Sequence, residues 1–232
     1  MRIHERETPS QYNRDRRGPR LAEWKGTMEI IEEKELFKTL AAKGIRPDEL
    51  GAPAYVDDDS VRGFDFSNLE PGRAAPGALD YVNPGDRVVE TAMVEALFQI
   101  IHSLGLFPLY LVAVDDEWAP EEPEEMKGMG HLSERETEAL GRVSAMNGGM
   151  NVLKLTAEEL ETASAIIAPQ MTLFSNRCVA MDGEGRFIAL FSEDDEVSLN
   201  TTDEKLYHAA RKLALEIRKT VPFDMIFAED SE

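Results

Sequence analysis

Two apolar runs on either side of a Gly-rich turn at 182–185 constrain the fold of this chain most strongly. Apolar and β-branched runs that flank a short Gly-containing loop are typical of a β-hairpin. We therefore expect strands at 171–181 and 186–192, and a short third strand around Val197 and Leu199. A hairpin near 171–192 that is followed by another strand indicates an antiparallel sheet.

Amphipathic repeats predict the helices that pack on this sheet. Val89, Met93, Leu97 and Ile100 lie four, four and three positions apart, which predicts a helix over 87–104. Similar repeats with capping residues predict further helices at 28–43, 133–146, 156–167 (closed by Pro169) and 202–219. Apolar runs predict additional strands at 107–114, 151–155 and 223–227. We therefore expect an α+β fold with an antiparallel sheet and several helices.

The N-terminal residues differ in charge from the rest of the chain. The first 25 residues carry seven basic and four acidic side chains (7 − 4 = +3), so the remainder carries −20 − 3 = −23. Because they hold few apolar side chains, we expect residues 1–26 to be a basic, extended arm that rests on an acidic body. Residues 27–228 are expected to form a single α+β domain, and clustered prolines and glycines predict an irregular connection over 45–85.

The charge and the missing motifs exclude several classes of function. A net charge of −20 opposes binding to nucleic-acid phosphates and to anionic membranes, so we expect neither as a partner. The first 25 residues contain no apolar signal segment, and the single cysteine, Cys178, reads as a buried strand residue; both features predict a cytoplasmic protein. Phosphate-binding loops and the common hydrolase and zinc-protease motifs are absent, so we expect no cofactor and no catalytic residues. His102 and His208 fall near apolar helix faces and are expected at the core or its boundary.

The candidate functional residues lie in an acidic segment at 115–125. This segment contains two prolines and no basic residue, so we expect an exposed loop without regular structure. Its carboxylates are Asp115, Asp116, Glu117, Glu121, Glu122, Glu124 and Glu125. A dense negative charge attracts basic proteins and accelerates their association. The sequence therefore predicts an acidic protein-interaction module that binds a basic partner, of the inhibitor, immunity, chaperone or assembly type.

The same segment permits a second interpretation. Asp115 and Asp116 follow a predicted buried strand, and His131 follows them along the chain. Carboxylate oxygens are the ligands that Mg²⁺ and Ca²⁺ prefer in proteins. The alternative is therefore a hydrolase-like enzyme that depends on a divalent metal, with Asp115, Asp116 and His131 as ligands and Glu117 or His131 as the acid/base.

Overall fold

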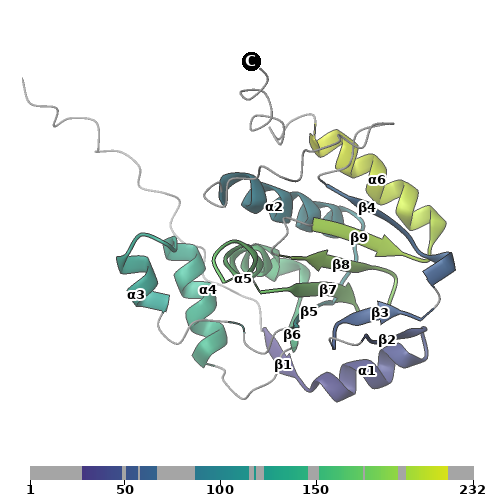
Figure 1. Cartoon of the computed structure of the whole chain (residues 1–232), viewed down its shortest axis with the longest axis horizontal. Coiled ribbons are helices and arrows are strands. Elements are labelled where there is room, and N and C mark those ends of the chain that lie inside the picture. Colours follow the sequence, from purple (N-terminus) through teal and green to yellow (C-terminus); the bar gives the residue numbers. More distant parts are fainter. Residues whose placement is uncertain are drawn as a thin grey trace, which may run out of the picture.

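The computed structural model describes residues 28–48, 51–56, 58–66, 87–114, 118, 123–145, 152–174, 176–192 and 197–218. Seven strands in these ranges form one antiparallel sheet in the order β1-β6-β5-β7-β8-β9-β4 (Figure 1). These strands are β1 (Glu29–Ile31), β4 (Arg62–Asp65), β5 (Leu109–Ala113), β6 (Val152–Leu155), β7 (Cys178–Asp182), β8 (Ile188–Phe191) and β9 (Val197–Thr201).

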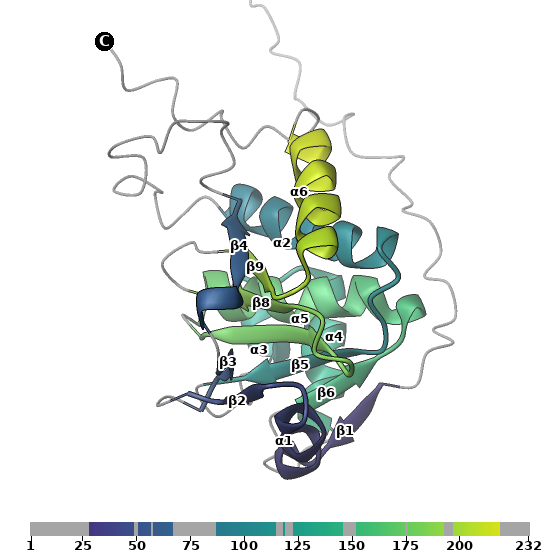
Figure 2. The same ribbon diagram turned by 90° about the vertical axis from the view of Figure 1, so that its right-hand side faces the viewer.

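Helices cover one face of the sheet, and a smaller layer covers part of the other (Figures 1 and 2). The first set contains α2 (Arg87–Ser103), α5 (Leu160–Thr172) and α6 (Glu204–Arg218), with α4 (Glu134–Ala145) packed beside α5 and α3 (Pro123–Gly128) packed beside α4. The smaller layer contains α1 (Glu33–Ala41) and the two-stranded sheet of β2 (Ile45–Pro47) and β3 (Pro53–Tyr55). Short 3₁₀ turns lie at η1 (Asp58–Ser60) and η3 (Ala157–Glu159). The predicted α+β fold with an antiparallel sheet is confirmed.

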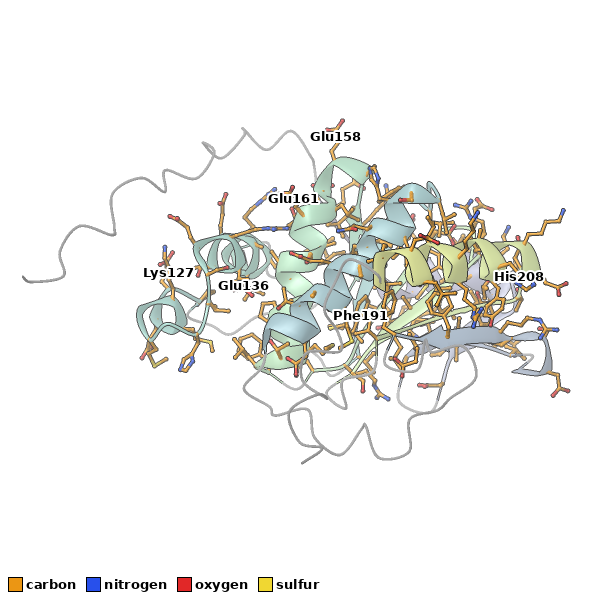
Figure 3. The ribbon with its side chains drawn as sticks, turned by 90° about the horizontal axis from the view of Figure 1, so that it is seen from above. Lys127, Glu136, Glu158, Glu161, Phe191 and His208 are labelled. Atoms are coloured by element: carbon orange, nitrogen blue, oxygen red, sulfur yellow. The ribbon has the colours of Figure 1, made fainter. Side chains whose placement is uncertain are left out.

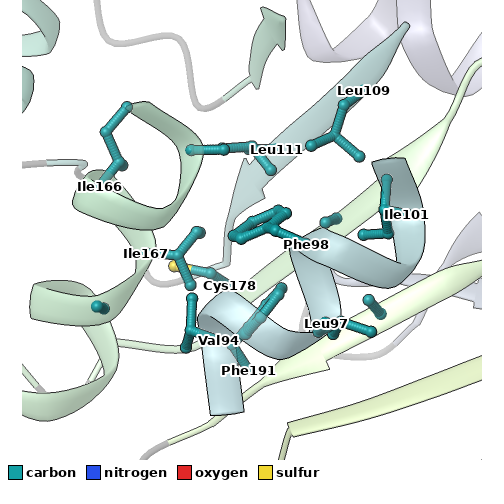
Figure 4. Packing of buried hydrophobic residues seen from close by; sticks show 14 of the residues in the cluster. Val94, Leu97, Phe98, Ile101, Leu109, Leu111, Ile166, Ile167, Cys178 and Phe191 are labelled. Carbon is teal, nitrogen blue, oxygen red and sulfur yellow. The ribbon is translucent and has the colours of Figure 1, made fainter. Parts of the chain in front are cut away.

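The main core lies between the sheet and the helices α2 and α5 (Figure 4). The rings of Phe98, on α2, and Phe191, on β8, are stacked with centroids 5.6 Å apart. Ile166 and Ile167 of α5 and Leu111 of β5 are buried in the same cluster. Because apolar side chains from both layers lose their contact with water here, this cluster is the main source of hydrophobic stabilisation.

A second apolar cluster holds the smaller layer against the opposite face of the sheet. Leu36, Leu40 and Ile45 pack there with Val179 and Met181 of β7. The Tyr55 hydroxyl, on β3, donates a hydrogen bond of 3.1 Å to the carbonyl oxygen of Gly185, in the β7–β8 turn. Burial, aided by the carboxylate of Asp182, raises the pKa of Tyr55 well above its ordinary value. The hairpin turn is therefore the contact point between the two sheets.

The helices predicted from periodicity agree best with the structure. The expected helix at 87–104 is α2, with Met93, Leu97 and Ile100 buried. The expected helix at 202–219 is α6, on which Ala210 is buried while Leu206, Leu213 and Ile217 are partly buried against the core. The strand predicted at 223–227 lies outside the described residues.

The prediction of one helix over 28–43 is wrong at its start. Residues Glu29–Ile31 form the edge strand β1, and the helix begins only at Glu33. The strand pairs with β6, and the Lys154 ammonium lies 2.8 Å from the Glu29 carboxylate across that pair. This contact raises the pKa of Lys154. The helical pattern over Glu29–Ile31 is only three residues long, so pairing with the distant strand β6 determines the conformation of these residues.

The predicted irregular connection over 45–85 is wrong for its first half. Strands β2, β3 and β4 lie between Ile45 and Asp65, and residues 67–86 lie outside the described ranges. Each of these strands has three or four residues, and β2 and β3 contain prolines at a terminal position. Such short strands carry too few residues for an alternating pattern, so only their tertiary pairing reveals them.

The expected helix end at Pro169 is also wrong. Pro169 lies inside α5, which continues to Thr172, so the strand expected from Met171 begins only at Cys178. A proline in a helix removes one backbone hydrogen bond and bends the chain. Here the residues from Thr162 to Met171 are all buried, and this tertiary packing keeps the helix intact.

Candidate functional site

The start of the acidic segment is anchored to the body of the protein by a buried tryptophan. Trp118 is only 5 % exposed, and its carbonyl oxygen accepts a hydrogen bond from the side-chain amide of Gln170, on α5. Just before the segment, the backbone N–H of Val114 donates to the Arg177 carbonyl at 3.0 Å. Of the predicted site residues, Asp115, Asp116, Glu117, Glu121 and Glu122 lie outside the described residues.

Gln170 is held in position by a network that is itself buried. Its side chain is fully buried, and its Oε1 accepts a hydrogen bond of 2.7 Å from Nδ2 of Asn176. The backbone N–H of Asn176 donates to the Gln170 carbonyl at 2.9 Å. Because buried polar groups are costly to leave unpaired, this network fixes Trp118 on α5. Trp118, which lies within the acidic segment, is therefore anchored to α5.

The acidic segment is not wholly irregular, which corrects the prediction for 115–125. Helix α3 begins at Pro123, where the fixed φ of proline and its missing N–H suit the first helical position. Glu124 and Glu125 follow in the first turn, where the positive end of the helix dipole stabilises carboxylates. Both side chains are exposed, so they present negative charge to solvent as expected.

His131, the predicted metal ligand, lies in the exposed connection between α3 and α4. Its backbone N–H donates to the Met126 carbonyl at 3.0 Å. Within the described ranges, no group of three His, Cys, Asp or Glu side chains is arranged to hold a metal ion. The two aspartates predicted as its co-ligands lie outside those ranges.

A cleft of about 670 Å³ opens where α2, α4 and α5 meet, beside His131. Its small and apolar lining residues are Ala92, Leu132, Ala165 and Ala168. Ser133 and Glu136 also line it, but they cap α4: the Ser133 N–H donates to Oε2 of Glu136 at 2.7 Å, and the Glu136 N–H donates to Oγ of Ser133 at 3.2 Å. This reciprocal capping box confirms the predicted helix start and occupies both side chains.

A second hollow of about 400 Å³ continues along the seam between α2 and α5. The two hollows are one helical turn apart on both helices, from Glu95 to Gln99 on α2 and from Ser164 to Glu161 on α5. At the boundary, Nη2 of Arg135 donates to the Glu161 carbonyl at 2.6 Å. We call the two hollows together the α2–α5 groove.

The α2–α5 groove is acidic along its edges. Its four carboxylates belong to Glu95, Glu136, Glu158 and Glu161, and Arg135 is its basic residue. Figure 3 shows Glu158 and Glu161 near the start of α5, with Glu136 on the neighbouring α4. A groove with small apolar residues and carboxylates along its edges is suited to bind a segment that carries both apolar and cationic side chains. The sequence contained a signal for it, because the groove residues 92, 95, 99 and 102 recur at helical spacing on α2.

The remaining candidate nucleophile and bases have ordinary structural settings. Cys178 is buried in β7, as predicted. His102 and His208 are exposed, so their expected place at the core or its boundary is wrong. Each lies on the solvent side of its helix, because the neighbouring apolar positions, not the histidines, face the sheet.

Comparisons with protein-family models, with curated proteins and with solved structures find no match. Among the described residues, no helix is both long and apolar enough to cross a membrane.

Proposed function

We propose that this protein binds a basic protein through the acidic segment 115–125, as an inhibitor, immunity, chaperone or assembly protein of the cytoplasm. The buried Gln170–Trp118 anchor is the observation that carries the proposal, because it holds Trp118, a residue within the acidic segment, on the buried helix α5. A partner that docks on side chains already held in place loses less conformational freedom than one that must order them. The exposed carboxylates of Glu124 and Glu125 extend the negative charge onto α3.

The charge pattern supports recognition by long-range attraction. Complementary potentials raise association rates by orders of magnitude at low salt, and they penalise partners of the wrong charge. The whole chain carries the charge for such an encounter, since it has 45 acidic and 25 basic residues. A single buried cysteine, Cys178, is consistent with the reducing cytoplasm.

The test combines partner capture with association kinetics. Affinity purification and mass spectrometry identify a basic partner, and the purified pair is then measured at several salt concentrations. The variant carries Gln in place of Glu121, Glu122, Glu124 and Glu125. We expect association roughly tenfold slower at low salt and a flatter salt dependence, with unchanged thermal unfolding.

A matched control separates this segment from general negative charge. It carries Gln in place of Glu32, which is the N-cap residue of α1, of Glu33 and Glu35, which lie on α1, and of Glu204, which begins α6. Equal slowing by both variants would contradict a local acidic site. A melting temperature that rises with millimolar Mg²⁺ or Ca²⁺, and that loses this rise in Asp115→Asn, would overturn the proposal in favour of a metal site.

A further inference from the structure

The described chain begins beside the α2–α5 groove. In the antiparallel pair of β1 and β6, Glu29 faces Lys154 and Ile31 faces Val152. Met28 therefore lies at the end of β6 that leads directly into η3. Ala157 and Glu158 of η3 line the groove. The residues that precede Met28 consequently join the folded body next to one end of this groove.

These preceding residues have the charge that the groove lacks. The groove holds four carboxylates and Arg135, a charge of 1 − 4 = −3. Between Arg14 and Lys25 the chain carries five basic and two acidic side chains, a charge of 5 − 2 = +3. The same stretch contains Leu21 and Trp24. Opposite charges of equal size and matching apolar groups make the two surfaces complementary.

We propose that the α2–α5 groove is the docking site of the chain's own N-terminal segment Arg14–Lys25. The arginines of this segment pair with the exposed carboxylates of Glu95, Glu158 and Glu161, and Leu21 and Trp24 cover the small apolar residues of the groove. This inference goes beyond the proposed function and does not depend on any partner. It names an intramolecular ligand for the α2–α5 groove.

The segment is long enough to reach the whole groove. The groove residues on α2 span 91–103, which corresponds to about 18 Å of helix at about 1.5 Å per residue. From Met28 back to Arg20 an extended chain covers up to about 26–29 Å, at 3.3–3.6 Å per residue. Because the segment is tethered at the groove, its effective concentration there is in the millimolar range, so weak charge pairs suffice for docking.

Limited trypsin digestion of the full-length protein tests the proposal, since trypsin cleaves after Arg14, Arg16, Arg17, Arg20 and Lys25. The groove variant carries Gln in place of Glu95, Glu158 and Glu161, whose side chains are exposed and leave the fold intact. Mass spectrometry at early times measures how fast these five bonds are cleaved. We expect the cleavage to be roughly threefold to tenfold faster in the variant than in the wild type at low salt. At 1 M NaCl the two proteins should be cleaved at the same rate.

A control variant and a cross-linking experiment make the result specific. Glu32→Gln, Glu35→Gln and Glu204→Gln remove the same charge elsewhere and should leave cleavage unchanged. A carbodiimide should link the Lys25 amine to Glu158 or Glu161 within one molecule, as shown by mixing isotopically light and heavy protein. Equal cleavage of the wild type and the groove variant at low salt would overturn the proposal, and so would links found only between two copies.

The same digestion separates this inference from the proposed function. The variant with Gln at positions 121, 122, 124 and 125 is expected to keep the arm protected, because it leaves the carboxylates of Glu95, Glu158 and Glu161 in the groove unchanged. If that variant alone loses protection, the arm rests on the acidic segment, and docking in the groove is overturned. Failure to find a basic partner would contradict the proposed function but leave this digestion result unaffected.

Discussion

The side-chain amide of Gln170 donates a hydrogen bond to the backbone carbonyl of Trp118, which lies 52 positions earlier in the chain. The bond joins the middle of a buried helix to the acidic segment. The other end of the same amide accepts from Asn176 in the loop after α5. One buried side chain therefore joins three segments, which are α5, the loop that follows it, and Trp118 of the acidic segment.

Replacing Gln170 with Ala should destabilise the protein by about 2–4 kcal/mol, because it leaves the Trp118 carbonyl and the Asn176 amide without these partners in a buried site. Urea unfolding gives this value, and tryptophan fluorescence reports whether Trp118 becomes exposed. Gln99→Ala, on the exposed side of α2, is the control and should change stability by less than about 0.5 kcal/mol. Equal effects of the two changes would contradict the anchor.

Two glycines should respond to alanine in opposite directions. Gly185 has φ = +67°, and a Cβ there would lie 2.8 Å from Cδ1 of Ile45. We expect Gly185→Ala to lower the free energy of unfolding by about 1–3 kcal/mol, since both backbone strain and crowding oppose it. Gly141, inside α4, has open space around it, so Gly141→Ala should stabilise the protein by up to about 1 kcal/mol. Thermal unfolding of both variants checks the pair, and a stable Gly185→Ala protein would contradict the contact between the hairpin and β2.

Stability should fall at alkaline pH because of Tyr55. Its pKa is raised in the folded protein, so this contribution to stability is complete below the ordinary pKa of about 10 and is lost as the pH rises above it. Tyr55→Phe should lose about 1 kcal/mol at pH 7, through the missing bond to Gly185, and should show a shallower alkaline fall. Urea unfolding from pH 7 to 11 measures both effects. Lys154 also has a raised pKa, so its contribution to stability is lost at alkaline pH as well. We therefore expect the stability of Tyr55→Phe to fall less steeply with pH than that of the wild type, but still to fall. An equally steep fall in both proteins would contradict the role of Tyr55.

Shortening one apolar side chain on α2 and one on α6 should show which helix contributes more to the buried core. Leu97, on α2, is fully buried, so Leu97→Ala should cost about 2–5 kcal/mol. Leu213, on α6, is only partly buried, and Leu213→Ala should cost less than half as much. Chemical denaturation of the two variants under the same conditions gives the comparison. A larger loss for Leu213→Ala would mean that α6 contributes more to the core than its exposure indicates.

The elements that could be predicted are those with enough residues to show a period. Helix α2 spans 17 residues, and the apolar repeat through Leu97 appears in its sequence as it does in the core. Strand β1 spans only three residues and exists because β6 pairs with it, so no local pattern could reveal it. Pro169 misleads for the same reason, since the burial that keeps α5 intact is a tertiary property.

The candidate site was only half accessible to sequence reasoning. Uncompensated charge is visible in composition, which is why the acidic segment and the exposed Glu124 and Glu125 were predicted. The α2–α5 groove joins Glu95 to Glu161, residues that are far apart in the chain and meet only when two helices pack antiparallel. The residues at helical spacing on α2 indicate one wall of such a groove, but the sequence does not show that α5 forms the opposite wall.

The order of the strands also determines when the sheet can be completed during synthesis. The edge strands β1 and β4 come from the first third of the chain, yet their partners are the later strands β6 and β9. Arg62 of β4, for example, can pair with Thr201 of β9 only after Thr201 has been synthesised. The five inner strands, from β5 to β9, pair without them and follow one another in the sequence. A nascent chain therefore leaves β1 unpaired until β6 is made, and leaves β4 unpaired until β9 is made. During that interval these segments are open to pairing with other chains, so chaperone binding or slow translation would matter most at the N-terminal third.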